Sequence, residues 1–450
     1  MSLDPPADDR NLLEDLLKKA KARGADGADG MLARSTSLSH AQRLGEIEKI
    51  EREESFDLGL RVFRGRKQAV VSSTDLSTEA LDELVDRALA MAGTVPDDPW
   101  CGLADPDQLS TVAPELDMVD TDEPTGEDLI AMARTCEDAA RAVDGITNSE
   151  GAEAGWSHSQ VTLAATNGFS GGYARTDFSV GVSVIAGEGT DMEGDYDYSQ
   201  AVFRGDLEDP ATTGTNAGTR AVSRLGGRKM PTTGAPVIFD PRVASGLLGH
   251  LTGAISGPAV ARGTSFLKDR LNTAVFAPGI TVVDDPHRPR GLRSKPFDGE
   301  GLPNEKLNLV EDGVLMTWLL DLASARQLGL TSSGRASRGT SAPPNPAPTN
   351  LYLEAGTKTP DQLMADIDSG FYVTSLMGMG VNGVTGDYSR GASGFWIEGG
   401  KLSFPVTEMT IAGNLKDMYQ NLTPANDLVF RYGANSPTVR IEGMTVAGGN

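Results

Sequence analysis

The first part of the chain is patterned as helices that alternate with strands. Apolar residues recur at helical spacing, which predicts a first helix over residues 9–24. Alternation of apolar and polar residues with a period of two then predicts strand-like segments from about Met31 to Ser73. Ser77 is expected to cap a second helix.

The same order of elements returns further along the chain. After a connector rich in Pro and Asp over residues 94–123, Thr125 and Asp128 are placed as the capping box of a third helix. Strands return from Ile146, and residues 210–225 are expected to be helical. SLSHAQ (37–42) and GWSHSQ (155–160) occupy similar positions in the two halves. This arrangement suggests a duplicated layer of helices on strands.

The sequence GGRKMPTTGAP (226–236) is typical of a linker, and the pattern of apolar residues and glycines changes after it. Beyond it, short apolar runs lie among many glycines, and a proline-rich loop over 331–349 is expected to be functional or mobile. We therefore predict an α+β protein of two domains. Residues 1–230 are expected to form layers of helices on an antiparallel sheet, and residues 231–450 a β-rich domain with mixed sheets.

Composition and charge exclude several classes of protein. The formal net charge of the 450-residue chain is −23, and a nucleic-acid binder needs a basic surface instead. No apolar run approaches the roughly 20 residues that span a bilayer. The acidic start lacks the layout of a secretory signal, so a cytoplasmic location is expected. Two cysteines, Cys101 and Cys136, argue against a disulfide framework or a Cys-based zinc site.

One of only four histidines, His250, lies in the stretch LLGHLTGAISG (247–257). A helical zinc site needs a second histidine about one turn away and a nearby Glu as general base. Neither Asp nor Glu occurs between Pro241 and Lys268, and the next histidine is His287. These residues therefore favour a histidine on a buried or interfacial helix over a metal ligand.

The other histidines offer weaker candidates. His287 could join Asp284 and Asp285 in a carboxylate–imidazole cluster, but a strand that ends in a turn at the sequence DDP is the preferred interpretation. His40 and His158 lie in strand-like segments and are expected to be structural.

No serine nucleophile stands in a G-x-S-x-G motif, since Ser256 occupies the fourth position of GAISG (253–257). The most unusual stretch is GDYSRGASGFW (386–396). In it Arg390 could hold a peptide carboxylate or could pair with Asp387, and the residues favour neither interpretation.

Several C-terminal segments together resemble the TldD/PmbA family, and more specifically its TldE (PmbA) branch. The segments are LLGHLTGAISG, KPFDGEG (295–301), TWLLDLASARQLGL (317–330), MGMGVNGVTGDYSRGASGFWIEGG (377–400) and PVTEMTIAGNLKDM (405–418). The resemblance implies a cytoplasmic metalloprotease of two subunits that processes peptide precursors or degrades an unfolded protein. The older label of the family is modulator of DNA gyrase.

The resemblance also implies which zinc-site residues this chain lacks. Gly249, His250 and Ala254 stand where the TldD branch has His, Glu and His, and Tyr432 stands where family members can carry Cys. No zinc is therefore expected in this chain, and a TldD-type partner would supply it. The substrate groove would be lined by residues of both stretches, namely His250, Asp387, Tyr388, Ser389 and Arg390.

Three functions remain open at this point. The first is a non-catalytic subunit that binds a TldD-type metalloprotease subunit and shapes a chamber for a peptide or unfolded-protein substrate. The second is a hydrolase with another catalytic set, such as Ser389 or Ser256 with His250. The third is a homodimeric peptide-binding or scaffold protein that acts alone.

Overall fold

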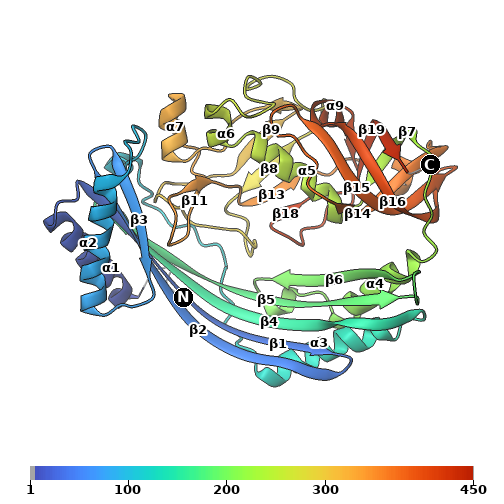
Figure 1. The fold of residues 1–450 in the computed structure, drawn as a ribbon, viewed down its shortest axis with the longest axis horizontal. Helices are drawn as coiled ribbons and strands as arrows, with labels where there is room; N and C mark the ends of the chain where they lie inside the picture. Colours follow the sequence, from blue (N-terminus) through green and yellow to red (C-terminus); the bar gives the residue numbers. More distant parts are fainter. Residues whose placement is uncertain (1–5, 449–450) are drawn as a thin grey trace.

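The computed structural model describes residues 6–448, and its N-terminal part is built on one long antiparallel sheet. The six strands lie in the order β3-β2-β1-β4-β5-β6 and curve into a half-barrel (Figure 1). Their bounds are β1 Gly27–Arg43, β2 Glu46–Arg64, β3 Lys67–Ser73, β4 Ile146–Ala165, β5 Ser170–Ala186 and β6 Glu193–Ala201.

Four helices cover one face of this sheet. They are α1 Ala7–Ala22, α2 Thr78–Thr94, α3 Gly126–Arg141 and α4 Pro210–Ser223. Even-numbered residues of β1 face the helices: Leu32 packs in the core under α1 and α2, and Leu38 in the core under α3 and α4. Odd-numbered residues such as Asp29 face the other way, toward the C-terminal part of the chain.

The predicted caps and connector are confirmed, with one correction. Ser77 accepts a hydrogen bond from the Ala80 N–H, and Thr125 and Asp128 form a capping box. The first helix spans Ala7–Ala22 rather than residues 9–24, since Asp8 and Asp9 lie within its first turn and Arg23 is its C-cap. Between α2 and α3, the connector contains only the short 3-10 turn η1 Pro106–Gln108 among its described elements. No helix within residues 6–448 is both long and apolar enough to cross a membrane.

The register of the central strand pair supports the internal duplication. The order helix, three strands, helix occurs twice, and β1 and β4 are the equivalent strands. Thr36 lies opposite His158, and His40 lies opposite Ala154. At a constant offset of 118 residues, Thr36 in the first half corresponds to Ala154 in the second half, and His40 corresponds to His158. The pairing of β1 with β4 is therefore the same when the two halves are exchanged. His40 and His158 are thus equivalent positions on the two central strands.

The C-terminal part holds a closed barrel. Strand β16 pairs with both β15 and β19, which closes the sheet β16-β15-β14-β7-β19, and β17 adds to β19. The bounds are β7 Thr233–Phe239, β14 Ser369–Met377, β15 Asp387–Glu398, β16 Lys401–Asn414, β17 Leu422–Pro424 and β19 Val439–Ala447. Since β7 begins at Thr233, the linker is shorter than the predicted 226–236.

A second sheet, in the order β10-β9-β8-β13-β18, packs beside the barrel. It comprises β8 Val282–Asp285, β9 Leu307–Glu311, β10 Val314–Leu315, β13 Asn350–Leu353 and β18 Ala434–Asn435. The remaining short elements are η2 Arg204–Asp206, α5 Pro241–Ala254, α6 Gly257–Ala261, α7 Leu322–Leu328, β11 Ala336–Ser337, β12 Asn345–Pro346, α8 Pro360–Met364 and α9 Leu415–Gln420. Parallel and antiparallel pairs both occur, as the predicted mixed sheets require.

The proline-rich loop over 331–349 joins the two parts of the chain. Arg335 is fully buried and pairs with Asp284, and Arg338 reaches across to Asp29 on β1. Thr340 packs on β2 so closely that a Cβ at Gly59 would lie 2.2 Å from the Thr340 carbonyl oxygen. The loop is therefore anchored to both parts of the chain through the buried ion pairs of Arg335 and Arg338, whereas residues 341–343 are exposed.

Candidate functional site

The outer edge of the half-barrel, strand β6, faces helix α5 across a cleft. Two cavities of about 470 and 460 Å³ are lined by residues from both elements. Tyr196 on β6 and Arg242 and Ser245 on α5 line both cavities, while Tyr432 lines the first and Arg390 the second. We call this space the interdomain cleft.

Three tyrosines form an aromatic row along the cleft. The rings of Tyr196 and Tyr198 stack with centroids 6.3 Å apart, and Tyr198 lies 5.1 Å from Tyr432. Burial, followed by the neighbouring phenols, raises the pKa of Tyr198 to about 12. The phenols of Tyr198 and Tyr432 thus stay protonated at neutral pH and can donate hydrogen bonds.

An ion pair ties the two walls of the cleft together. Arg242 Nη1 lies 2.8 Å from Asp195 Oδ1, and Arg224 Nη1 lies 3.4 Å from Asp195 Oδ2. Burial disfavours the ionised form of Asp195, but the hydrogen bond and charge of Arg242 outweigh it, so the Asp195 pKa is lowered. Asp195 is therefore ionised at neutral pH and holds β6 against α5.

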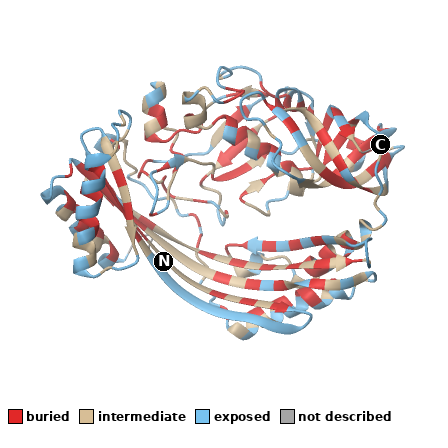
Figure 2. Cartoon of the chain, in the orientation of Figure 1, coloured by how far each residue is buried: buried red, intermediate tan, exposed pale blue. Residues whose placement is uncertain are grey.

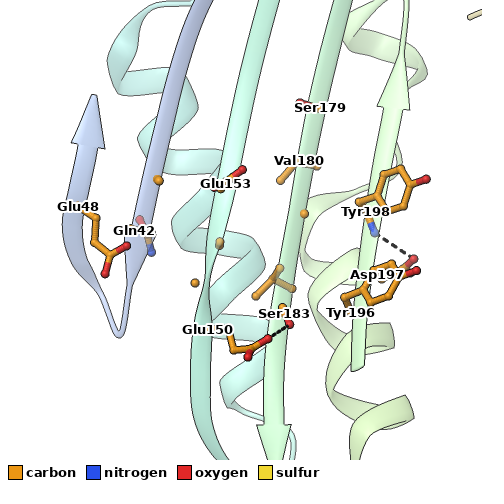
Figure 3. Close-up of a pocket in the computed structure, with 15 residues that line it drawn as sticks. Gln42, Glu48, Glu150, Glu153, Ser179, Val180, Ser183, Tyr196, Asp197 and Tyr198 are labelled. Carbon is orange, nitrogen blue, oxygen red and sulfur yellow. Dashed lines mark hydrogen bonds between the residues drawn. The ribbon is translucent and has the colours of Figure 1, made fainter. Parts of the chain in front are cut away.

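The inner face of the half-barrel continues the cleft as a polar hollow of about 370 Å³ (Figure 3). Small residues such as Ser179, Gly181 and Ser183 line it together with the two β6 tyrosines. Glu150 points into the hollow and accepts a hydrogen bond from Ser183 at 2.5 Å (Figure 3). The hollow therefore lies on the face of the sheet opposite the four helices, next to strand β6.

Helix α5 presents a bare face to open space. A Cβ at Gly246, Gly249 or Gly253 would meet nothing within 4 Å, and Gly249 is exposed. His250 is half-buried beside this face, and its ring lies edge-on to Tyr388 with centroids 5.8 Å apart. The two stretches singled out in the sequence are therefore neighbours, because β15 runs past α5.

Alternation along β15 divides the GDYSRG residues between two faces. Tyr388 is buried toward His250, and Arg390, half-buried on the same face, donates from Nε to the Met377 carbonyl. Asp387 and Ser389 are exposed on the opposite face. Asp387 accepts hydrogen bonds from Thr385 and Asn414 instead of pairing with Arg390, so the interpretation of an Asp387–Arg390 ion pair is wrong.

The Tyr388 hydroxyl is a further feature of this contact. It is buried and has no hydrogen-bond partner, and burial raises its pKa to about 12. Arg390 forms no ion pair with any carboxylate of the described chain, although it lines the cleft. A cationic group without a counter-charge is thus available on this wall.

The residues at the expected metal position do not fit a zinc ion. The side chains of Gly249 and Ala254 carry no donor atom, so His250 is the one residue of this stretch with a ligating side chain. Tyr432 is packed against Tyr198. Throughout residues 6–448, no group of three or more His, Cys, Asp or Glu side chains is arranged to hold a metal ion.

The remaining candidates have structural surroundings. The His287 N–H donates to Asp285 and its Nε2 lies 2.8 Å from Asn304 Oδ1, while Asp284 pairs with Arg335; the turn interpretation is confirmed. Ser256 is the residue before α6. Cys136 is buried between α3 and the sheet, and burial raises its pKa to about 12, so it is no nucleophile.

We expect the pKa of His250 to lie below the ordinary value of 6.5. Burial is the larger cause and the positive charge of Arg390 the second. Arg390→Gln should therefore raise the His250 pKa, measured by NMR titration of the histidine ring protons, whereas Arg66→Gln on the exposed β2–β3 turn should not. An unchanged pKa in the Arg390 variant would show that the guanidinium does not act on the ring.

Sequence reasoning missed the cleft residues on β6. The run DYDYSQ (195–200) alternates acidic and aromatic residues, which indicates a strand with two different faces. It does not indicate that Asp195 meets Arg242, because the two residues come from separate parts of the fold.

Comparisons with known proteins assign a family to this architecture. Models of the PmbA/TldA metallopeptidase match the chain as domain 1 over residues 28–92, the central domain over 120–225 and the C-terminal domain over 232–448. Metalloprotease PmbA of Escherichia coli O157:H7 is 38% identical over 444 residues, which cover 98% of this chain and 97% of that protein. A Metalloprotease TldD homolog of Buchnera aphidicola is 25% identical over 218 residues, or 45% of this chain and 44% of that protein.

Solved structures share the whole fold. A protein named as a modulator of DNA gyrase from Bacteroides thetaiotaomicron has a TM-score of 0.90 at 26% identity, covering 98% of this chain and 99% of its own. TldE from Thermococcus kodakarensis has a TM-score of 0.86 at 21% identity, with 97% and 100% covered, a likeness of fold. By its sequence and its architecture, the chain belongs to the PmbA/TldD metallopeptidase family.

Proposed function

We propose that this chain is a non-catalytic, TldE/PmbA-like subunit that shapes a peptide-binding chamber with a TldD-type metalloprotease subunit. One observation supports the proposal above all. Helix α5 borders a cleft, but the side chains of Gly249 and Ala254, at the positions expected for zinc ligands, have no donor atoms. The TldD-type subunit would contribute the zinc and the general base. A cytoplasmic location is part of the proposal.

The β6 edge supports binding of an extended peptide. In the six-stranded sheet β6 pairs only with β5, and the cleft lies along its other side. On this edge the Tyr196 carbonyl accepts a hydrogen bond from Arg242, and the N–H groups of Tyr196 and Tyr198 donate to Asp195 and Asp197. A peptide that adds to the edge would replace these bonds with backbone hydrogen bonds, which suit substrates of varied sequence. The exposed rings of Tyr196 and Tyr198 would pack on its side chains.

Arg390 supports recognition of a peptide carboxylate. Its guanidinium lines the cleft without an acidic partner, next to Ser375 and Thr374. Of the residues expected in the groove, Arg390 lines the cleft, and Tyr388 is buried behind it against the half-buried His250. Asp387 and Ser389 are exposed on the opposite face of β15. The net charge of −23 opposes a direct contact with DNA.

The experiment measures zinc and peptide cleavage for this chain alone, for a TldD-type subunit alone and for the two mixed. We expect this chain alone to contain less than one zinc ion per molecule. We expect cleavage of an unfolded peptide to require both subunits, or to be much faster when the two are mixed. Replacing both Tyr196 and Tyr198 by Ala should lower cleavage by roughly tenfold through lost contact area, and Val112→Ala in the connector should leave it unchanged.

Two results would reject the proposal. If the chain neither co-purifies with a TldD-type subunit nor changes its proteolysis, it is not such a subunit, and a homodimeric binding protein becomes the better description. Cleavage by the isolated, chelator-treated chain would indicate the hydrolase. Ser389 does not support that alternative, since it lies on the strand face opposite Tyr388 and the His250 contact.

A further inference from the structure

A small cavity lies at the junction of the half-barrel with the C-terminal part of the chain. Its volume is about 30 Å³, which is room for roughly one or two water-sized particles. Residues of β1, β4 and β5 form one wall, and the loops that contain Phe297 and Arg338 form the other. Figure 2 shows the strands as buried or half-buried where these loops approach them. We call this space the junction cavity.

The guanidinium of Arg338 lines the junction cavity and has two donors without a partner. Its side chain is only 1% exposed, and its Nη1 lies 2.5 Å from Asp29 Oδ1. Nε and Nη2 are buried and have no hydrogen-bond partner among residues 6–448. These two N–H groups point in parallel from one edge of the guanidinium plane, which is the edge that binds an anion through two hydrogen bonds. Buried donors that remain unpaired cost free energy, so an acceptor is expected at this edge.

The charges around Arg338 are not balanced by the chain itself. Arg61 and Arg338 share the single carboxylate of Asp29. Glu300 lies 4.0 Å from Arg61, but burial raises the Glu300 pKa to about 8, so this carboxyl holds its proton at neutral pH. One of the two buried guanidinium charges therefore has no counter-charge of its own.

Lys295 brings a further cationic group to the wall of the cavity. Its Nζ donates to Ser337 Oγ at 3.3 Å, and it forms no ion pair with any carboxylate of residues 6–448. Burial lowers the Lys295 pKa, because the charged ammonium is poorly compensated there. Asp298 is the one carboxylate that lines the cavity, and its oxygens accept three backbone N–H groups instead.

The size and the other walls of the cavity select a small anion with a single charge. A volume of about 30 Å³ is too small for sulfate, phosphate or the carboxyl end of a peptide. Much of the remaining wall is apolar, and a doubly charged, strongly hydrated ion is disfavoured there. The apolar residues are Met31, Val161, Leu163 and Phe297. A water molecule would fit, but it would bring no negative charge to Arg338 and Lys295.

We propose that the junction cavity binds a chloride ion between the Nε–Nη2 edge of Arg338 and the ammonium of Lys295. The ion supplies the counter-charge that Asp29, shared with Arg61, provides only in part. Because strands of the half-barrel and loops of the C-terminal part both line the cavity, the ion holds the two parts together. Chloride then stabilises the folded chain, since the unfolded chain has no such site. This inference does not depend on the proposed function.

Bromide locates the ion directly, because it replaces chloride and scatters X-rays anomalously. Crystals of the full chain grown in sodium bromide should show an anomalous peak within hydrogen-bond distance of Arg338 Nε and Nη2. Thermal unfolding is then compared in sodium chloride and in sodium gluconate at equal ionic strength, because gluconate is too large for the cavity. Above the dissociation constant, each tenfold rise in chloride should lower the unfolding equilibrium constant by up to tenfold.

Two variants test the proposed ligands. Arg338→Lys keeps a positive charge beside Asp29 but removes the guanidinium edge, and Lys295→Met replaces the ammonium by a side chain without charge. Each should lose the bromide peak and weaken the chloride dependence at least tenfold. The matched control is Arg23→Lys, at an exposed arginine that pairs with Asp86, and it should keep both effects.

The measurements on the unmodified chain decide the proposal even if a variant fails to fold. A water molecule without anomalous signal at this position, or equal stability in chloride and gluconate, would overturn it. A bromide peak without any chloride effect on unfolding would indicate an adventitious ion only and would also overturn it. The same holds if both folded variants keep the full chloride dependence.

Discussion

Replacing Asp29 by Asn should lower the free energy of unfolding by about 3–5 kcal/mol, because it leaves two buried guanidinium groups without a counter-charge. Asp29 is buried on β1 and lies 2.5 Å from Arg61 on β2 and 2.5 Å from Arg338 in the proline-rich loop. Burial opposes ionisation of Asp29, but the charges of Arg338 and Arg61 outweigh it and its pKa is lowered. The stabilisation is therefore present above the ordinary value of 3.8 and is lost as the pH falls through the lower folded-state pKa.

Urea unfolding at pH 7, followed by circular dichroism, measures this effect. The matched control is Asp86→Asn, since Asp86 pairs with Arg23 on the surface at 70% side-chain exposure and should cost less than about 1 kcal/mol. Because Arg338 belongs to the C-terminal part and Arg61 to the half-barrel, the Asp29 variant should also loosen the junction between them. Equal effects for the two variants would show that the cluster contributes no more than a surface pair.

Replacing Glu300 by Gln should have the opposite effect and should raise the free energy of unfolding at neutral pH. Glu300 is buried in the KPFDGEG loop at the same junction, and burial raises its pKa to about 8 although Arg61 lies 4.0 Å away. The folded chain then holds a proton that the unfolded chain releases above the ordinary value of 4.5. Stability from this group falls as the pH rises from 4.5 to about 8, which amounts to roughly 3 kcal/mol at pH 7.

A neutral Gln removes that cost and can still accept the hydrogen bond that the Leu322 N–H donates to Glu300 at 2.8 Å. The stability gain should be small at pH 4.5 and should increase up to about pH 8, as measured by urea unfolding at several pH values. Glu305→Gln, at an exposed position, should show no such dependence. A Glu300 variant that loses stability with rising pH would mean that Glu300 is ionised beside Arg61.

Local sequence patterns were sufficient to predict those elements whose structure depends on neighbouring residues. The caps at Ser77 and Thr125, the alternation of Phe178 to Val184 and the helix around His250 follow from side-chain spacing and backbone hydrogen bonding within a few residues. The same holds for the duplicated order of helices and strands. The boundary at residue 230 stays a prediction.

Contacts between distant segments were not available from such patterns. The loop over 331–349 has the composition of an exposed linker, yet Arg335 and Arg338 are buried because their partners Asp284 and Asp29 lie 51 and 309 residues away. Likewise, the sequence around Arg390 did not indicate that Asn414, 27 residues from Asp387, would donate a hydrogen bond to this carboxylate.

The sequence by itself determined the family, the α+β layers and the absence of donor atoms at Gly249 and Ala254, because these depend on residue identity and local spacing. Only the tertiary structure decided that His250 meets Tyr388, that β6 borders a cleft and that Arg338 and Lys295 line one cavity. These features arise from the curvature and pairing of strands far apart in the chain. The physical reason is that pairing a distant strand or burying a charge depends on which partner the fold brings within contact distance.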